Sequence, residues 1–127
     1  MTLTLHTGNW FGGEAVSLAL NYTGAAEFQA SGYVPFTAGN GTEYGEGRQY
    51  EKFSFLRIYE SGHEVPYYQP EASLAFFKRV LGNLVLSDGS EPLTDGYVTT
   101  GQANATHTEP FVPLPTCTGE FSCSATP

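Results

Sequence analysis

The pattern of apolar and polar residues is most distinctive in residues 53–59, which lead into a short polar loop. The side chains on one predicted strand face are Phe53, Phe55, Arg57 and Tyr59, and those on the other are Ser54, Leu56 and Ile58. Because successive side chains of a strand point to opposite faces of a sheet, this segment is apolar on both faces apart from Ser54 and Arg57. The pattern predicts a strand covered on both sides, as at the centre of an α/β sheet.

Helical patterns precede and follow this strand. Apolar residues recur at steps of three and four across residues 9–21, which predicts a helix there, and a shorter helix is predicted for residues 25–30. After the polar loop, Pro70 opens a helix that is predicted to run through residue 81. The apolar face predicted for this last helix consists of Leu74, Phe77, Val80 and Leu81.

Two further segments complete the predicted layout. The dipeptide Asn40-Gly41 is a strong turn signal, and the stretch that follows it predicts a strand over residues 44–50. Residues 83–127 are rich in Gly, Ser, Thr and Pro and poor in aromatic side chains. That composition predicts a tail with only partial order.

Length and charge exclude several function classes. The 127 residues suffice for one domain, and 5 Lys+Arg against 13 Asp+Glu give a net charge of −8, which disfavours binding to nucleic acids and to anionic lipids. No apolar run reaches the roughly 18 residues of a membrane span, and the first residues lack a signal-peptide pattern. We find no nucleotide-binding glycine fingerprint, and His6 and His107 have no second ligand at a metal-binding spacing, so we expect no cofactor and no metal.

The candidate chemistry lies in the loop after the predicted strand, Gly62-His63-Glu64-Val65-Pro66. In acyl transfer an imidazole must reach both a hydroxyl and a leaving amine, and a short loop after a sheet strand suits that task. Gly62 permits a tight turn and Pro66 stiffens the exit. The alternative is a loop histidine that hydrogen-bonds to the backbone, and the residues alone favour that alternative.

Three motifs change this balance: Asn9-Trp10, the His63 loop, and Pro70-Glu71-Ala72-Ser73-Leu74. Together they make the region from residue 9 to about residue 81 similar to the serine carboxypeptidases, a family with the α/β-hydrolase fold. The resemblance implies an α/β fold class, with this chain forming the C-terminal part of an α/β-hydrolase fold: helices, a strand pair, the histidine loop and a final helix, followed by a partly disordered tail. It also implies release of C-terminal residues from peptides and proteins by a Ser-His-Asp triad, without a cofactor.

The resemblance assigns roles to two residues of this chain, whereas the serine and the aspartate of the family's triad have no counterpart in it. His63 corresponds to the triad histidine, and Glu64 to a position that lines the pocket for the departing residue, although an ordinary solvated carboxylate is an equal alternative for Glu64. The family's aspartate lies shortly before its Asn-Trp motif, but residues 1–8 contain no aspartate, and no G-x-S-x-G serine motif occurs. We therefore divide the chain into a non-family extension (1–8), the C-terminal part of a carboxypeptidase-like domain (9–82) and a tail (83–127).

A chain of this kind is expected to be inactive alone, because a base without its nucleophile retains little catalytic function. A separate N-terminal chain that supplies the missing groups would be its complementing partner, and peptide or protein C-termini would be the substrates of the parent enzyme. The alternative function is a non-catalytic secreted binding module built on the carboxypeptidase scaffold.

Other features suggest a secreted or vacuolar/lysosomal parent glycoprotein whose signal peptide lies outside this chain. The tripeptides that begin at Asn21, Asn40 and Asn104 are candidate glycosylation sites, although any one of them can arise by chance. Cys117 and Cys123 enclose five residues and are candidates for a small disulfide loop, with two free thiols as the alternative.

Overall fold

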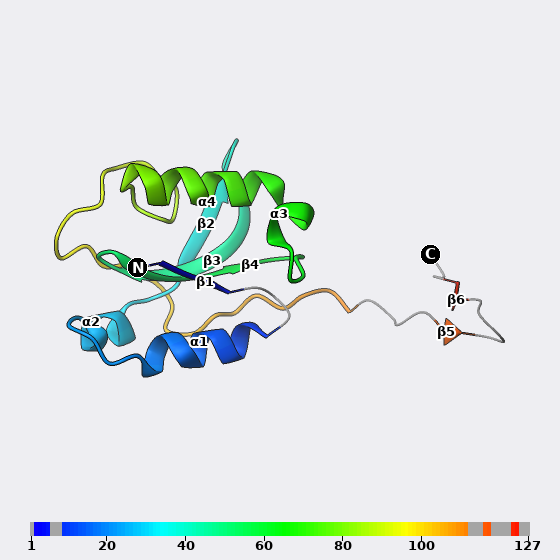
Figure 1. Cartoon of the computed structure of the whole chain (residues 1–127), viewed down its shortest axis with the longest axis horizontal. Helices are drawn as coiled ribbons and strands as arrows, with labels where there is room; N and C mark the ends of the chain where they lie inside the picture. The colour runs from blue at the N-terminus through cyan, green and yellow to red at the C-terminus, as the bar shows by residue number, and fades with distance from the viewer. Residues whose placement is uncertain (1, 6–8, 112–115, 118–122, 125–127) are drawn as a thin grey trace.

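The computed structural model describes residues 2–5, 9–111, 116–117 and 123–124. Its centre is a four-stranded sheet in the order β1 (Thr2–Leu5), β4 (Phe53–Ile58), β3 (Thr42–Tyr50) and β2 (Val34–Ala38). Strands β2, β3 and β4 pair antiparallel, whereas β1 pairs parallel with β4. The sheet thus joins three consecutive antiparallel strands to one parallel neighbour (Figure 1).

Helices lie on both faces of this sheet (Figure 1). One face carries α1 (Trp10–Ala19) and α2 (Ala25–Ala30), and the other carries α3 (Val65–Tyr68) and α4 (Pro70–Gly82). Two short strands, β5 (Thr116–Cys117) and β6 (Cys123–Ser124), pair antiparallel with each other. The predicted helices and strands are all present, and the mixed helix and strand content is compatible with part of a carboxypeptidase fold. No helix within the described residues is both long enough and apolar enough to cross a membrane.

Strand β4 is buried along its whole length, which confirms that it is covered on both faces. Towards α3 and α4, the buried cluster consists of Phe36, Leu56, Ile58, Val65, Ala72 and Leu86. Towards α1 and α2, it consists of Phe28, Tyr33, Phe53 and Phe55. Each fully buried aromatic or aliphatic side chain contributes about 1.5–3 kcal/mol of transfer free energy. The two clusters therefore fix the strand from which the His63 loop begins.

The predicted apolar face of α4 is not the face that packs on the sheet. The buried residues of this helix are Ala72 and Arg79, with Ala75 and Phe76 partly buried beside them. The large apolar side chains Leu74, Phe77, Val80 and Leu81 are exposed. The side of α4 that packs over Phe36, Leu56 and Ile58 thus carries two alanines, one phenylalanine and one arginine rather than the predicted apolar face.

The segment after Gly82 folds back onto the sheet. Val85, Leu86 and Thr99 are all buried, although the composition predicted only partial order. Thr99 exchanges backbone and hydroxyl hydrogen bonds with Gln49 of β3, and its carbonyl accepts from the Gly32 amide at 2.9 Å. With the contacts of His107 and Glu109 described below, the segment is part of the packed structure through residue 109, whereas Phe111 is exposed.

Arg79 joins three segments through backbone carbonyls. Its guanidinium donates to the carbonyl oxygens of Leu86 at 2.8 Å and Ser87 at 3.0 Å, and to that of Thr37 in β2. The group lies 4.7 Å from the centre of the Phe36 ring. Burial lowers the pKa of Arg79 from its usual value, which the Asp88 carboxylate partly offsets. This arginine holds the segment after α4 against the sheet.

We expect Arg79→Ala to lower the free energy of unfolding by about 3 kcal/mol, because it leaves buried carbonyl oxygens without donors. Urea unfolding followed by circular dichroism measures this change. Lys78→Ala is the matched control, since the neighbouring side chain is exposed and its removal should change stability by less than about 0.5 kcal/mol. Equal losses from the two variants would contradict the role given to Arg79.

Candidate functional site

His63 lies in the loop that connects β4 to α3. The strand ends at Ile58, a turn covers Tyr59 and Glu60, and α3 begins at Val65. His63 and Glu64 are both exposed. The loop thus carries an accessible imidazole directly after the most buried strand of the sheet.

The entrance to this loop is held by two side-chain hydrogen bonds. The hydroxyl of Ser61 donates to the carbonyl of Ile58 at 3.3 Å, and the amide of Gln69 donates to the carbonyl of Tyr59 at 3.2 Å. The backbone N–H of Tyr59 donates to the carbonyl of Tyr44 in β3 at 2.8 Å. These bonds leave little freedom at the point where the chain exits the sheet.

The exit from the loop is fixed by packing. Val65 is buried at the start of α3, and Pro66 occupies the first turn of this helix, where a missing N–H costs nothing. A Cβ on Gly62 would lie 3.2 Å from the ring of Tyr68, so this position favours glycine through close approach. Pro66 lies at the exit as predicted, whereas Gly62 does not have a positive φ, so its position uses the small size of glycine rather than its backbone freedom.

Strands β1 and β4 bring their C-terminal ends together. Because β1 and β4 are parallel, Leu5 and Ile58 end their strands at the same edge of the sheet. The connection from β1 to α1 is where the resemblance places the triad aspartate, and its residues 6–8 are His, Thr and Gly. The sequence supplies no acid at that position.

Asn9 and Trp10 have structural roles. The side-chain oxygen of Asn9 accepts a hydrogen bond from the Gly12 amide at 3.1 Å and caps α1, as the residue type favours. The ring of Trp10 lies 4.2 Å from the Arg57 guanidinium and packs against the aromatic cluster under α1. Trp10 therefore covers the one cation on that face of β4.

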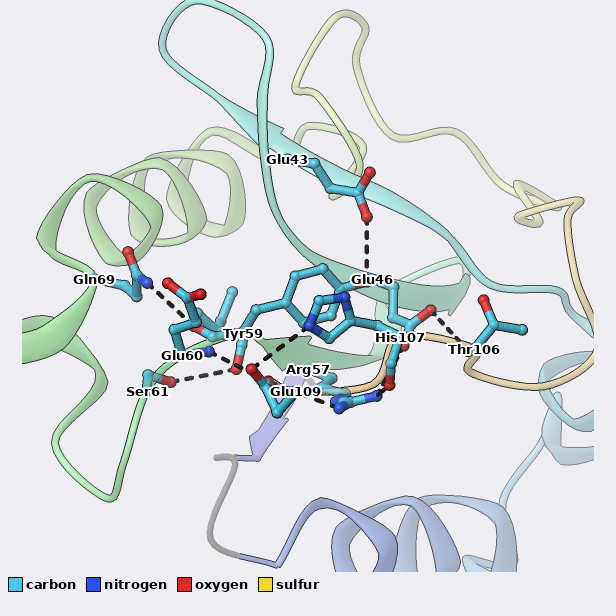
Figure 2. Close-up of polar contacts among 11 residues, drawn as sticks. Glu43, Glu46, Arg57, Tyr59, Glu60, Ser61, Gln69, Thr106, His107 and Glu109 are labelled. Atoms are coloured by element: carbon cyan, nitrogen blue, oxygen red, sulfur yellow. Dashed lines mark hydrogen bonds and ion pairs between the residues drawn. The ribbon is translucent and has the colours of Figure 1, made fainter. Parts of the chain in front are cut away.

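Arg57 is the centre of a polar cluster at the end of β4 (Figure 2). Its guanidinium lies 3.2 Å from a carboxylate oxygen of Glu46, which is directly opposite it on β3. It also donates to the backbone carbonyl of His107 at 2.9 Å and lies 3.8 Å from the carboxylate of Glu109. Arg57 and Glu46 are both buried, so the charges depend on each other and on the segment that contains His107.

Tyr59 connects this cluster to the His63 loop. Its hydroxyl donates to Glu43 at 3.2 Å, and its ring stacks on the His107 imidazole with 3.5 Å between centroids. Burial raises the pKa of Tyr59 well above its usual range, and the carboxylates of Glu46 and Glu43 raise it further. The folded state therefore keeps this phenol protonated where an unfolded chain ionises it.

The other predicted site residues lie away from this cluster. Asn21, Asn40 and Asn104 are exposed, as glycosylation acceptors must be, and their use stays a prediction. The backbones of Cys117 and Cys123 pair directly across the β5–β6 ladder, a register that suits the predicted disulfide. His6 lies outside the described residues. Within the part of the chain that the structure describes, no group of three or more His, Cys, Asp and Glu side chains is arranged to hold a metal ion.

Sequence reasoning missed the Arg57 cluster, although one signal was present. Arg57 was an exception in an otherwise apolar strand, and a buried arginine needs acceptors around it. Glu46, His107 and Glu109 carried no comparable signal, because they are up to 63 residues apart in sequence and meet only through the sheet register and the returning tail. From the sequence alone, His107 is a candidate only for a metal ligand.

The pH dependence of stability tests the environment of Tyr59. Since its pKa is raised in the folded state, its contribution is complete below pH about 10 and is lost as the pH rises above that value. We expect Tyr59→Phe to flatten the loss of unfolding free energy above pH about 10 by up to about 1.4 kcal/mol per pH unit. Urea unfolding at several alkaline pH values measures the slope, with Tyr67→Phe, a 78% exposed tyrosine, as the control. An unchanged slope in Tyr59→Phe would contradict this description.

Comparison with known proteins identifies the family. The model of the serine carboxypeptidase family matches residues 6–83, which is more than half of the chain. Carboxypeptidase S1 homolog A of Arthroderma otae is 48% identical over 114 residues, covering 86% of this chain and 17% of that protein. The Trichophyton rubrum protein of the same name is 43% identical, covering 86% and 18%. No solved structure matches the chain.

A further relative has a different printed name. Carboxypeptidase Y homolog of Arthroderma benhamiae is 38% identical over 115 residues, covering 86% of this chain and 18% of that protein. The chain therefore spans less than a fifth of the length of these curated relatives. By the family match and by these identities, the chain belongs to the serine carboxypeptidase family.

Proposed function

We propose that this chain is the C-terminal portion of a serine-type carboxypeptidase and that His63 is the general acid/base of the parent enzyme. The observation that carries the proposal is the family match over residues 6–83, which includes the exposed loop after the buried strand β4. Family membership favours a catalytic His63 over a loop histidine that only hydrogen-bonds the backbone.

The chemistry assigned to His63 is proton transfer at a C-terminal peptide bond. Its imidazole accepts the proton of a serine hydroxyl as that oxygen attacks the last peptide carbonyl. The same proton then passes to the amine of the leaving residue, and a water molecule resolves the acyl-enzyme by the reverse sequence of transfers. Exposure of the loop supports this role, because the imidazole must meet both substrate and nucleophile.

The serine and aspartate belong, in this proposal, to a part of the parent that this chain does not include. The sequence has no G-x-S-x-G motif and no aspartate ahead of Asn9. We infer an α/β-hydrolase fold for the parent, since β1 and β4 run parallel and end at one edge, as the strands that carry an aspartate and a histidine would. The isolated chain should accordingly lack peptidase activity until it is combined with the missing portion.

We infer a secreted or vacuolar compartment for the parent. Exposed asparagines in three sequons and the cross-strand register of Cys117 and Cys123 support it, since glycans and disulfides form along the secretory route. The relatives' names state no compartment, so this inference depends on the features of the chain itself.

Replacement of the histidine tests the central assignment. In the complete protein that contains this sequence, His63→Ala is expected to lower kcat for release of a C-terminal residue by at least about 10⁴-fold with KM little changed. Lys78→Ala serves as the control, because that exposed side chain lies on α4 away from the loop. If His63→Ala keeps kcat within tenfold of the unmodified enzyme, His63 is not the base.

Glu64 is proposed to select basic C-terminal residues through the attraction of its carboxylate. We expect Glu64→Gln to lower kcat/KM for peptides ending in Lys or Arg by about tenfold relative to peptides ending in Leu. Competition between two peptides in one assay measures the ratio directly. An equal loss for basic and apolar terminal residues would leave Glu64 as an ordinary solvated carboxylate.

A further inference from the structure

Residues 105–109, which we call the strap, lie across the end of β4 although they are far from it in sequence (Figure 2). The strap lies beyond residues 6–83, the region that the family model matches. The matches to the relatives named above cover 86% of the chain, which is more than residues 1–83 can supply. Those relatives therefore share sequence with this chain after α4 as well.

The strap is fastened to the sheet by charged and aromatic contacts. Arg57 donates to the carbonyl of His107 at 2.9 Å, and the amide of Thr106 donates to Glu46 at 3.4 Å. The His107 ring stacks on Tyr59 at an interplanar angle of 11°. Because Arg57 and Glu46 are buried, the strap closes a polar site that would otherwise face solvent.

Glu109 reaches from the strap to the His63 loop. One of its carboxylate oxygens accepts a hydrogen bond from the backbone N–H of Glu60 at 3.3 Å and lies 3.8 Å from Arg57. Its other oxygen lies 3.6 Å from the imidazole of His107. The carboxylate thus contacts the loop, the sheet and the strap together.

Glu60, whose backbone N–H donates to Glu109, has an unfavourable backbone conformation. Glu60 has φ +50, in the left-handed region that non-glycine residues seldom adopt. Such a residue keeps its conformation only where surrounding contacts hold it. Glu60 is the second residue of the turn and lies three residues before His63, so its conformation sets the direction in which the loop leaves β4.

The geometry points to Glu109 as a positioning residue for His63: by holding the Glu60 amide, the strap fixes the loop that presents the imidazole. This inference rests on the proposed function of His63, since only a catalytic histidine makes the loop conformation matter for turnover. It assigns to a segment outside the matched family region a part in arranging the site. Loss of the acceptor frees the turn at Glu60, whereas a neutral acceptor of the same shape retains the hydrogen bond.

The first test is amide hydrogen exchange on the 127-residue chain by NMR. In Glu109→Ala the Glu60 amide should exchange about tenfold faster, as loss of one hydrogen bond to a charged acceptor implies. The Tyr59 amide, which donates to Tyr44, should be unchanged. Glu109→Gln should stay within about threefold of the unmodified chain, because its amide oxygen still accepts.

The matched control is Glu91→Ala. Glu91 is an exposed glutamate between α4 and the strap, and its replacement should leave the exchange rate of the Glu60 amide unchanged. Three results would overturn the inference: an unchanged Glu60 rate in Glu109→Ala, an equal acceleration at amides throughout β3 and β4, or a Gln variant as fast as the Ala variant.

The second test uses turnover by the complete protein. Glu109→Ala should lower kcat about tenfold with KM unchanged, and Glu109→Gln should restore most of it. A rise in KM without a fall in kcat would overturn the positioning role. If His63→Ala has no effect on kcat, the proposed function fails, and the exchange experiment still decides whether Glu109 holds the loop.

Discussion

A guanidinium group can only donate hydrogen bonds, so a buried arginine needs acceptors on several sides, and in this chain most of those acceptors are backbone carbonyls. Arg48 donates to the carbonyls of Gln29 and Ser31, Arg57 to that of His107, and Arg79 to those of Thr37, Leu86 and Ser87. Each group also lies against an aromatic ring. The end of α2 and the returning tail therefore supply acceptors for cations that the sheet alone could not bury, although Nε of Arg48 and Nε of Arg57 have no hydrogen-bond partner among the described residues.

This dependence explains why the segment after α4 is packed against the domain. Without it, the guanidinium groups of Arg57 and Arg79 would lose acceptors in positions from which water is largely excluded. The same segment shields the Arg57–Glu46 pair, whose desolvation is costly unless its remaining donors and acceptors are satisfied. Around Arg57, tail, sheet and histidine loop thus form one connected polar arrangement on the α1 side of β4, whereas Arg79 holds the tail on the α4 side.

Much of the layout followed from local patterns, because burial on both faces of β4 and the turn at Asn40-Gly41 leave clear periodicities in sequence. Local patterns misjudged α4, whose largest apolar residues are exposed: periodicity locates a helix face but does not say what already fills the space beneath it. They also understated the order of residues 83–109, which comes from distant partners such as Gln49, Arg57 and Arg79.

The candidate site likewise has one part that the sequence predicts and one part that it does not. The position of His63 was readable from a strand followed by a Gly/Pro-bounded loop, since both signals lie within a few residues of each other. The cluster around Arg57 was not, because Glu46, His107 and Glu109 are brought to it by strand register and by a segment that returns from the far end of α4. Long-range polar partners of this kind leave no periodic trace.

Burial of three of the five cationic side chains has a consequence for colloidal behaviour. Arg48, Arg57 and Arg79 are buried, so Lys52 and Lys78 are the lysine and arginine side chains left at the surface. Among the described acidic residues, by contrast, Glu46 is the only one that is buried. The outer surface is therefore more one-sidedly anionic than the net charge of −8 implies. Mutual repulsion between molecules then opposes association through the exposed apolar side chains of α4, and this protection disappears near the isoelectric point of about 4.6.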